Sequence, residues 1–494
     1  MNALLVFPEF PDTFWSMKHA LALAGKKATA PPLGLATVAA MLPDDWSLRL
    51  VDLNIEDLTD ADIDWADAVL LSGMVIQRDA ARRIIDRVKP KGVMTIAGGP
   101  LFTTEPEMFD DVDHLVLNEG EITLPRFLED LANGEAKHLY TSDEFPDITE
   151  SPVPRWDIVD DRAYTNRSIQ YSRGCPHNCD FCSVTQLFGH RWRTKTPQQV
   201  MAELDAIYDS GWRGSINFVD DNLAGRPRIL KEELLPALIE WRKGKDPLTF
   251  GTQIGIEIAD DPELMAMMVK AGFDSVFIGI ETVDEASLSE CNKRQNQNRD
   301  LLEDIHRIQR SGLMVTGGFI VGFDHDEPTV FERMSDFIQQ SGITTAMVGV
   351  LQAPAGTKLF ERLRDEGRIA GEMSGDNVNG LTNVVTRMDP STLRSGYRRL
   401  LRRIYSADQY YARIRTFMRN YRPPRRRPPR LRGWHIRAYF NALIKLGFAR
   451  RDGWRYHGLL WWTLFRRPRA YPIAITLAIA GHHFQVLAEG LPEQ

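Results

Sequence analysis

Three of the four cysteines of this 494-residue chain lie within eight residues, in the pattern Cys175-x3-Cys179-x2-Cys182. So few cysteines, grouped so tightly, are typical of a metal or redox site in a reducing compartment and not of an extracellular disulfide framework. Four closely spaced thiolates would close a zinc or electron-transfer site, whereas three leave one metal position without a protein ligand. On an iron–sulfur cluster, that position allows a substrate or cofactor to bind iron directly.

A zinc site is the alternative interpretation of the same cysteines. His177 or His190 would then supply the fourth ligand. Zinc pairs rarely use this spacing, so the cluster interpretation is favoured. The remaining cysteine, Cys291, lies far along the chain and is interpreted as an ordinary free thiol.

The cysteine motif directly follows the first apolar run of a β/α series. Six such runs indicate strands, and helical stretches separate them. Six β/α units fall short of the eight of a complete barrel, so a partial, TIM-like (β/α)6 barrel is expected. After about residue 370 the strand pattern stops, and the rest is expected to be helical. The strands are expected at 168–174, 215–221, 248–258, 275–281, 313–323 and 345–352, and the helices at 197–210, 229–243, 261–272, 299–312 and 327–341.

Residues 1–140 show a second alternation of apolar runs and helical stretches. Short runs without strict alternation are typical of parallel strands buried on both faces, so a doubly wound, Rossmann-like α/β domain is expected. Ligands of such sheets bind beyond the carboxyl ends of the strands, where Gly73, Gly98, Gly99 and Gly120 fall. These glycines favour close approach by a large flat or phosphate-bearing ligand, although each could simply form a tight turn. The strands are expected at 3–7, 48–53, 68–73, 93–99 and 114–120, and the helices at 33–42, 77–89 and 121–132.

The composition is that of an ordinary folded protein. Hydrophobic residues make up 43% and charged residues 26% of the chain, which excludes a disordered, collagen-like or disulfide-stapled protein. The first residues have no basic region and lead directly into a strand, so no signal peptide and a cytoplasmic location are expected. The expected domains are 1–140, a Pro- and Asp-rich connector at 141–167, a barrel at 168–370, and a helical, basic region at 371–494.

The three-cysteine motif, with Phe181 before its last cysteine, resembles that of the radical S-adenosylmethionine (SAM) enzymes. The resemblance covers about 168–370, and the first 140 residues look like the cobalamin-binding domain of one large subgroup. It implies a [4Fe–4S] cluster held by Cys175, Cys179 and Cys182, with SAM on the fourth iron. In this family the reduced cluster cleaves SAM to a 5′-deoxyadenosyl radical, which removes a hydrogen atom from an unactivated carbon. An electron donor such as a flavodoxin or ferredoxin is implied as a partner.

The resemblance also assigns candidate SAM contacts. Asp221, in Asp220-Asp221-Asn222 after the second strand, would face the SAM ammonium, because a cation there needs an acceptor. The alternative for this segment is a helix N-cap. Glu281, at the end of the fourth strand, would contact the ribose, and the alternative is a surface salt bridge.

Two further segments are similar to the adenine-binding parts of the family. Gly318, Ile320 and Gly322 match the glycine-rich fifth strand, although glycines can also mark a bulge. Gly356 lies in a turn, 354–359, that resembles the one lining the adenine pocket after the sixth strand.

The similarity to cobalamin-binding domains rests on the segments 31–34, 98–100 and 119–121. The Asp-x-His-x-x-Gly motif, which supplies an axial histidine in many cobalamin proteins, is absent, and the surroundings of His19 do not fit that role. This subgroup commonly lacks the histidine. Two interpretations therefore stay open, a domain that binds cobalamin and a vestigial one.

The C-terminal region carries a strong positive charge. Residues 419–469 contain 14 arginines and one lysine against one acid, giving a charge near +14 in a chain whose net charge is −7. Arginines mixed with aromatic residues are typical of a segment that lies at the surface of an anionic membrane. RNA binding, and a solvated tail or helical cap, are the alternatives. The apolar run 470–481 is too short to cross a bilayer. The aromatic residues are Trp434, Tyr439, Phe440, Trp454, Trp461, Trp462 and Phe465.

These features together predict a radical SAM enzyme that functionalises an unactivated carbon of a hydrophobic, lipid-like substrate, with peripheral contact at the inner face of the membrane. The arrangement resembles the cobalamin-type enzymes that methylate or remodel polycyclic lipids, so cobalamin-dependent methyl transfer is the leading hypothesis. Cyclisation, coupling or oxidation without cobalamin is the alternative within the family. An RNA-modifying radical SAM enzyme is less favoured, since the tail lacks the strands of an RNA-binding barrel, and nucleic acid is not expected as a partner. A non-catalytic iron–sulfur electron carrier would not need the SAM motifs.

Overall fold

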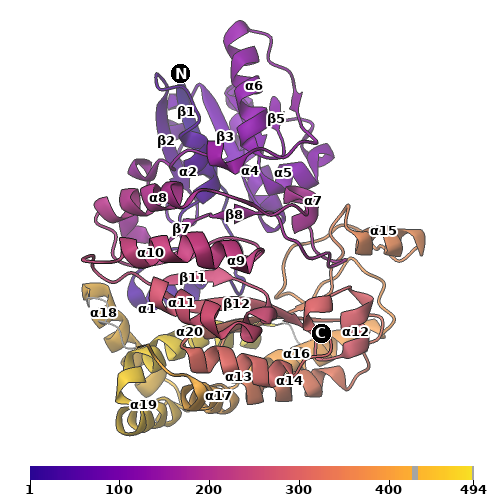
Figure 1. Ribbon diagram of the computed structural model, residues 1–494. Coiled ribbons are helices and arrows are strands. Elements are labelled where there is room, and N and C mark those ends of the chain that lie inside the picture. Colours follow the sequence, from indigo (N-terminus) through magenta and orange to yellow (C-terminus); the bar gives the residue numbers. More distant parts are fainter. Residues whose placement is uncertain (425–431, 492–494) are drawn as a thin grey trace. The chain divides into compact units, whose positions relative to one another are not determined.

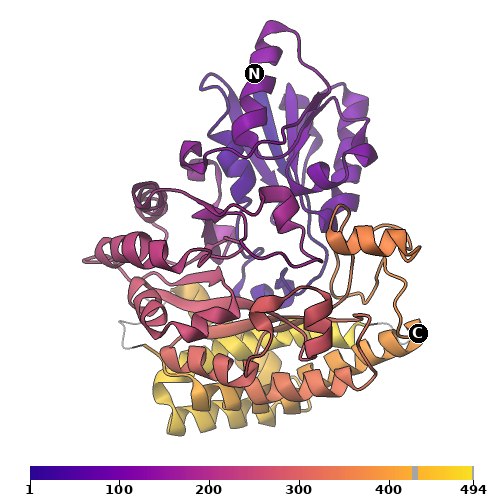
Figure 2. The same cartoon turned by 45° about the vertical axis from the view of Figure 1, so that its right-hand side comes forward.

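The computed structural model describes residues 1–424 and 432–491 (Figures 1 and 2). The arginine-rich run 425–431 of the basic region lies outside the described residues. The chain forms two compact units. Unit 1 comprises Met1–Pro11, Lys27–Pro176 and Ser183–Trp212, and unit 2 comprises Asp12–Lys26, His177–Cys182 and Arg213–Gln494.

Unit 1 contains a parallel sheet in the order β2-β1-β3-β4-β5-β6. All five predicted strands form, and the sheet gains a two-residue sixth strand that is too short to give a periodic signal. The order reverses between β1 and β3, which is the switch point where ligands of doubly wound sheets bind. The strands are β1 (Asn2–Phe7), β2 (Ser47–Asp52), β3 (Ala68–Ser72), β4 (Met94–Gly98), β5 (His114–Val116) and β6 (Leu139–Tyr140).

Helices cover both faces of this sheet, as alternate residues of the central strand show. Ala3 and Leu5 pack with helices α2 (Leu33–Ala39) and α6 (Gly120–Asn133). Leu4 and Val6 pack on the opposite face, and all four side chains have no exposed surface. The opposite face is covered by α3 (Asp60–Trp65), α4 (Arg78–Val88) and α5 (Pro100–Thr104). The prediction of a doubly wound α/β domain is therefore confirmed.

The rest of unit 1 consists of short elements. The connector contains 3-10 turns, and a small antiparallel pair, β8–β9, follows it. The first strand of the predicted barrel series, β7, and its helix α8 belong to this unit. The bounds are η4 (Ile148–Glu150), η5 (Trp156–Ile158), η6 (Asp161–Ala163), β7 (Asn166–Ile169), β8 (Ser172–Arg173), α7 (Val184–Phe188), β9 (Arg193–Thr194) and α8 (Pro197–Asp209).

Unit 2 holds the other five strands of the series, parallel and in the order β14-β13-β12-β11-β10. The predicted strand 248–258 is too long, because the chain turns into a 3-10 helix, η8, at Ile256. A Cβ atom on Gly255 would lie 2.1 Å from the Glu257 carboxylate, so a larger residue there would displace that side chain. The strands are β10 (Ser215–Phe218), β11 (Phe250–Gln253), β12 (Phe273–Glu281), β13 (Met314–Val321) and β14 (Ala346–Val350), and η8 is Ile256–Asp260.

Helices connect the strands of unit 2 and lie along the outside of its sheet (Figure 1). The five predicted helices form, and the second of them contains a π-helical segment, η7. Two helices, α12 and α15, have no counterpart in the predicted pattern because each is only six to eight residues long. The bounds are α9 (Pro227–Ile229), η7 (Leu230–Leu234), α10 (Leu235–Trp241), α11 (Pro262–Ala271), α12 (Glu285–Glu290), η9 (Arg294–Asn296), α13 (Leu301–Ser311), α14 (Val330–Ser341) and α15 (Lys358–Asp365).

The described part of the C-terminal region is helical, as predicted. It includes a π-helical segment, η10, and ends in a long, mostly buried helix, α20. Helix α20 packs against α1 (Lys18–Ala24), a segment from the beginning of the chain, and His483 bonds to the carbonyl oxygen of Thr13 at 2.8 Å. Among the described residues, no helix has the length and hydropathy to cross a membrane. The bounds are α16 (Pro390–Tyr405), α17 (Ala407–Asn420), α18 (Gly433–Ala442), η10 (Leu443–Phe448), α19 (Trp454–Arg466), η11 (Pro468–Ala470) and α20 (Tyr471–Glu489).

Candidate active site

The three predicted cluster ligands are half-buried cysteines on one short loop, and they form no disulfide with one another. Cys175 lies at the end of a unit 1 segment, and its N–H donates to the carbonyl oxygen of Gly189 at 3.3 Å. Gly174, directly before it, has φ of +86°, and a Cβ atom there would lie 2.6 Å from the carbonyl oxygen of Arg191. Cys179 and Cys182 belong to unit 2. The loop 177–182 in unit 2 is called the cysteine loop below.

A short segment of unit 2, 291–296, supports the cysteine loop. The N–H of Asp180 donates to the carbonyl oxygen of Cys291 at 3.0 Å. The side-chain amide of Asn292 donates to the carbonyl oxygen of Asn178 at 2.7 Å. Gln295 donates to the sulfur of Cys179 at 3.7 Å. This backing segment therefore fixes the loop through both its backbone and one of its thiols.

Lys293, in the middle of the backing segment, places a buried positive charge next to the thiols. Its ammonium lies 2.7 Å from Oε1 of Glu281 and 6.0 Å from the ring centre of Phe181. Burial by itself would lower the pKa of Lys293, but Glu281 and the Cys179 sulfur outweigh it and hold this pKa above its usual value. Burial raises the pKa of the Cys179 thiol, and the Lys293 charge opposes that shift. The site therefore carries a fixed cation that favours the thiolate form a metal needs.

Glu281 occupies the carboxyl end of β12 in a constrained conformation. Its φ is +64°, in the left-handed region, and the pairing of β12 with β13 shifts register between Gly279 and Glu281. Asn296 of the backing segment donates to the carbonyl oxygens of Gly279 and Ile280, at 3.0 and 2.9 Å. The alternative of a salt bridge is confirmed, since Glu281 pairs with Lys293, but the pair is buried and not at the surface, because Glu281 is 7% exposed.

An apolar cluster fixes the other side of the cysteine loop. Phe181 packs against the ring of Phe323 at a centroid distance of 6.5 Å and contacts the same cluster as Ile320. The N–H of Leu359, in α15, donates to the carbonyl oxygen of Asp180 at 2.9 Å. The loop is thus held against the carboxyl ends of β12, β13 and β14, where parallel β/α folds place their active sites.

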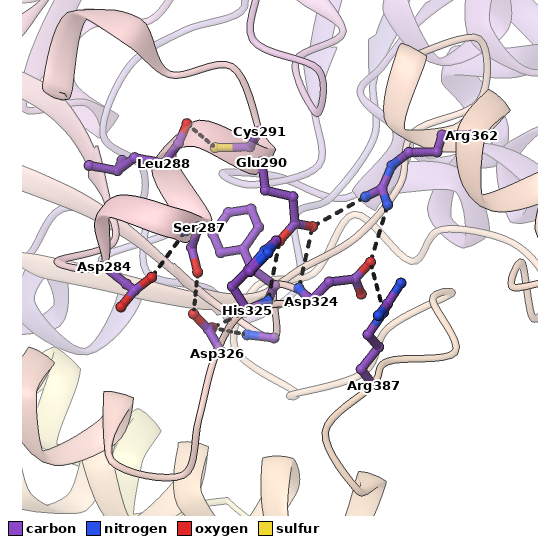
Figure 3. Close-up of polar contacts among 12 residues, drawn as sticks. Asp284, Ser287, Leu288, Glu290, Cys291, Asp324, His325, Asp326, Arg362 and Arg387 are labelled. Atoms are coloured by element: carbon purple, nitrogen blue, oxygen red, sulfur yellow. Dashed lines mark hydrogen bonds and ion pairs between the residues drawn. The ribbon is translucent and has the colours of Figure 1, made fainter.

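The glycine-rich strand β13 is held by a buried carboxylate just beyond its end (Figure 3). Asp326 Oδ2 accepts the N–H groups of Gly322 and Phe323, at 2.8 and 3.2 Å. Its Oδ1 accepts the hydroxyl of Ser287 at 2.8 Å. Burial raises the pKa of Asp326 to about 6 in spite of these hydrogen bonds. Gly322 has φ of +103° and therefore needs to be glycine, and a Cβ atom on Gly318 would lie 2.9 Å from the Phe277 ring.

A network of charges closes the same end of unit 2 (Figure 3). Arg362 bridges two carboxylates, Asp324 at 3.1 Å and Glu290 at 3.2 Å. Arg368 and Arg387 also pair with Asp324. Arg368, which contributes most, and Arg362 lower the pKa of Asp324 to about 2. The network joins α12, the loop after β13 and α15 into one support for the strand ends.

Two other predicted SAM contacts lie in loops of unit 2. Asp221 is half-buried in the loop after β10, and the neighbouring Leu223 N–H bonds to the carbonyl oxygen of Gln253 at the end of β11, at 3.0 Å. Gly356 is exposed, with φ of +77°, in the turn before α15. The contacts described above therefore link Cys179, Glu281 and Ile320 around the cysteine loop, and Asp221 and Gly356 lie in the loops that follow β10 and β14.

His177, a candidate zinc ligand, has another partner. Its Nε2 lies 2.8 Å from Oε1 of Glu257 in η8. Burial alone would raise the pKa of Glu257, but the hydrogen bond from His177 outweighs it and lowers that pKa. Within the described ranges, no three His, Cys, Asp or Glu side chains are arranged to hold a single metal ion.

The four glycines predicted to line the cobalamin site all lie at strand ends of unit 1. Gly98 and Gly99 are required by the fold itself. A Cβ atom on Gly98 would lie 2.5 Å from the Val116 carbonyl oxygen, and one on Gly99 would lie 2.4 Å from the Ser72 hydroxyl. A Cβ atom on Gly120 would meet nothing within 4 Å, and one on Gly73 only ordinary contacts. These two positions leave room for a ligand.

The carboxylates beside Gly120 have structural partners. Arg173 pairs with Glu119 at 2.6 Å and with Glu121 at 2.8 Å, and Arg193 pairs with Glu119 at 2.6 Å. Burial would raise the pKa of Glu121, but Arg173 outweighs it and lowers this pKa to about 2. The ion pairs fix the start of α6 to the β8–β9 pair.

A separate cavity of about 370 Å³ lies in unit 1. It is lined by Glu9, Leu53, Asp57, Leu58, Ala80, Arg83, Ile84 and Arg87, from the ends of β1 and β2 and from α4, and not by the four predicted glycines.

Several residues of the site carry no signal in the sequence. Lys293, Gln295 and Asn296 lie after α12, the last two in the short 3-10 helix η9, and no motif identifies them. Asp326 could have been noticed, because it lies four residues after the last glycine of the β13 motif, where a carboxylate can accept free N–H groups.

Comparisons with known proteins agree with this arrangement. The radical SAM superfamily matches residues 169–338, a B12-binding domain matches 22–128, and a domain of unknown function (DUF4070) matches 357–494. The chain belongs to the radical SAM superfamily, in the subgroup that carries an N-terminal cobalamin-binding domain.

Its relatives extend over most of the chain. It is 38% identical over 490 residues to an uncharacterised methyltransferase of Synechocystis sp., covering 98% of this chain and 91% of the relative. It is 37% identical over 372 residues to the hopanoid C-2 methylase of Rhodopseudomonas palustris, covering 74% of this chain and 70% of the relative. A solved structure of the cobalamin-dependent radical SAM enzyme OxsB, 14% identical, has the same fold with a TM-score of 0.63 over 99% of this chain and 79% of that chain.

The protein is thus a radical SAM enzyme, and its cofactors are a [4Fe–4S] cluster, SAM and cobalamin, as predicted. The residues present fit these groups. Unit 2 presents soft thiols beside a fixed cation, at the carboxyl ends of its parallel strands. Unit 1 presents the strand ends of a doubly wound sheet, with open space at Gly120 at the start of α6. An enzyme of this kind also needs an electron donor.

Proposed function

We propose that this enzyme transfers a methyl group to an unactivated carbon of a hydrophobic, lipid-like substrate. The observation that carries the proposal is the 37% identity with a hopanoid C-2 methylase, a protein named for acting on a polycyclic lipid. The cysteine loop held at the strand ends of unit 2 supports radical chemistry at this site. When bound, the cluster and SAM would supply the radical and cobalamin would carry the methyl group.

The residues of unit 2 would hold and orient the first two of these cofactors. Cys179 and Cys182, with Cys175 before them on the chain, would ligate the cluster, and Lys293 would compensate the negative charge of the thiolates. The contacts to SAM would come from loops at the strand ends. We assign Asp221 to the ammonium, Glu281 to the ribose, and Gly318, Ile320, Gly322 and Gly356 to the adenine.

The residues of unit 1 would hold cobalamin at the carboxyl ends of β3, β4 and β5. Gly73, Gly98, Gly99 and Gly120 would let the backbone approach the corrin. No axial histidine is assigned, because His19 lies in α1 of unit 2 and its ring contacts Asp12 at 3.3 Å and His483.

The partners follow from the same chemistry. A flavodoxin or ferredoxin would supply the electron. A cytoplasmic enzyme with peripheral contact at the inner membrane face would reach a lipid substrate. The exposed apolar and cationic side chains of α18 and α19 support this contact.

Anaerobic reconstitution tests the proposal. The protein should hold about four irons and four sulfides, and Cys175→Ala should lose both the cluster and the formation of 5′-deoxyadenosine. With cobalamin and a hopanoid dispersed in detergent, mass spectrometry should detect a product heavier by one methylene group. Stoichiometric zinc, or an intact cluster in the variant, would overturn the cluster assignment, and an unmethylated product would overturn methyl transfer.

The cobalamin site has its own spectroscopic test. The bound cofactor should show its dimethylbenzimidazole base displaced and no histidine nitrogen on cobalt. His19→Ala should leave the spectrum unchanged. Equal product formation with and without cobalamin would contradict the assigned role of unit 1.

A further inference from the structure

Helix α18 and the π-helical segment η10 expose a row of large apolar side chains. Ile436, Phe440, Ile444 and Phe448 are 52, 56, 61 and 75% exposed. Side chains four residues apart lie on the same face of a helix, so the four form one stripe. Of the seventeen large apolar side chains that are exposed among the described residues, eight fall between 436 and 465.

The opposite face of the same helix is the one that the fold uses. Ala438, Ala442 and Leu446 are 6, 0 and 1% exposed. The side-chain amide of Asn441 donates to the carbonyl oxygen of Leu23, which fixes α18 to α1 at 2.8 Å. Two of these three inward-facing residues are small alanines, whereas the large apolar residues of the stripe face outward. Most of the surface of the stripe is therefore left uncovered by this chain.

Helix α19 repeats this arrangement. Trp454, Trp461 and Phe465 are 68, 58 and 76% exposed, whereas Tyr456 and Leu459 of the same helix are fully buried. The rings of Trp461 and Phe465 stack at 5.7 Å.

The exposed rows of α18–η10 and α19 are connected. The ring of Phe448, the last residue of η10, lies 5.0 Å from that of His457 in α19. We call these side chains the apolar face, which consists of Ile436, Phe440, Ile444, Phe448, Trp454, Trp461 and Phe465.

Exposed cations flank the apolar face. Lys445, Arg451, Arg466 and Arg469 are exposed, and in the described part of the chain none of them pairs with a carboxylate. The nearby acids, Asp452 and Glu489, pair instead with Arg450. The surface therefore combines apolar side chains with uncompensated positive charge, and its counterpart must be both apolar and anionic.

We propose that the apolar face inserts into the headgroup region of a bilayer containing anionic lipid, with the flanking cations on lipid phosphates. This inference deepens the proposed function, because it identifies the surface by which an enzyme with a lipid substrate would reach it. Aromatic and apolar side chains beside arginines are the combination that lies at the interface of anionic membranes. RNA would match the charge but not the exposed apolar surface, and a second copy of this chain would match the apolar surface but not the positive charge.

Vesicle binding of the full-length, reconstituted enzyme tests the inference. Vesicles of equal parts phosphatidylglycerol and phosphatidylcholine should sediment the enzyme, and 1 M KCl should remove part of the binding but not all of it. Phe440→Ser with Phe448→Ser should weaken the salt-resistant part about 100-fold, roughly tenfold for each ring withdrawn from the interface. Arg451→Gln with Arg466→Gln should weaken only the salt-sensitive part, by roughly fivefold for each charge.

A matched control comes from unit 2 outside these helices. Leu381 and Val385 are 56 and 49% exposed, and replacing both with serine should leave vesicle binding unchanged. Lipids brominated near the headgroup should quench the tryptophan fluorescence of the enzyme. The quenching should decrease when Trp454 and Trp461 are replaced with phenylalanine.

Three outcomes would overturn the inference. The first is full vesicle binding by the Phe440 and Phe448 variant. The second is an enzyme that ignores vesicles but shifts RNA at physiological salt. The third is a dimer in solution that the same two substitutions dissociate, which would make the apolar face an interface between two copies.

Methylation of a detergent-dispersed substrate is measured separately. Binding without product would reject the proposed function alone, and product without binding would reject this inference alone.

Discussion

Asp326→Asn should make the enzyme more stable at neutral pH, although it alters a buried residue. The amide oxygen of asparagine can accept the N–H groups of Gly322 and Phe323 that Oδ2 accepts now. Its NH2 group can donate to the Ser287 oxygen, because the Ser287 hydroxyl can rotate its own proton away and accept instead. The substitution therefore keeps the three hydrogen bonds and removes only the ionisable group.

The size of the effect follows from the pKa of Asp326, which burial raises from 3.8 to about 6. The folded protein holds this proton more tightly than the unfolded chain does. Stability is therefore lost as the pH rises from about 4 to 6, and the loss is complete above that range. At 1.36 kcal/mol for each pKa unit, ionisation of Asp326 lowers the free energy of unfolding of the wild type by about 3 kcal/mol at pH 8. The asparagine variant avoids this loss of stability.

Urea unfolding of the anaerobic apoprotein between pH 5 and 8 measures the effect. The stability difference between variant and wild type should be roughly 1.5 kcal/mol at pH 5 and about 3 kcal/mol at pH 8. Asp324→Asn is the matched control, because arginines lower the pKa of Asp324 to about 2, so its charge stabilises the fold and its loss should destabilise it at pH 7. A stability difference for Asp326→Asn that does not change with pH, or a variant less stable throughout, would refute the reasoning.

Three further predictions concern the supports of the two units. Lys293→Met should destabilise the protein by about 3–5 kcal/mol in the same urea assay, because it leaves Glu281 buried without its partner. Adding Glu281→Gln should restore most of the lost stability, and additive losses in the double variant would contradict this. Gly98→Ala should cost about 1–3 kcal/mol through its clash with a backbone carbonyl, whereas Gly120→Ala should be nearly neutral without cobalamin; equal melting temperatures would show that the sheet adjusts. Cys291→Ser should keep a full complement of iron, since its thiol is buried 3.6 Å from a backbone carbonyl oxygen and is not an expected ligand; iron loss would make it one.

The chemistry of the site was predictable where it depends on residue type at close spacing. Cys175, Cys179 and Cys182 identify a family by themselves, and glycines at strand ends mark where backbone must approach a ligand. The strands were predictable because buried parallel strands are short, continuous apolar runs. These signals are local in the chain.

The supports of the site were not predictable, because they depend on contacts between distant segments. Lys293 meets Glu281 twelve residues away, across a helix that leaves no periodic signal. The aromatic residues of the basic region illustrate a second limit. Their composition predicts an interfacial segment, but only the packed structure shows that Phe440 and Phe448 face outward while Ala438 and Ala442 face inward.

The contact between α1 and α20 has a consequence for how the chain folds during synthesis. Residues 12–26 belong to unit 2, yet their packing partner, α20, is synthesised several hundred residues later. The hydrogen bond between Thr13 and His483 forms only after His483, 470 residues later in the chain, has been synthesised. Unit 2 therefore cannot be completed before α20 has emerged from the ribosome, and helix α1 lacks this packing partner until then. Cutting the gene between the units would separate these two helices, so the halves of this enzyme are expected to require expression as one polypeptide.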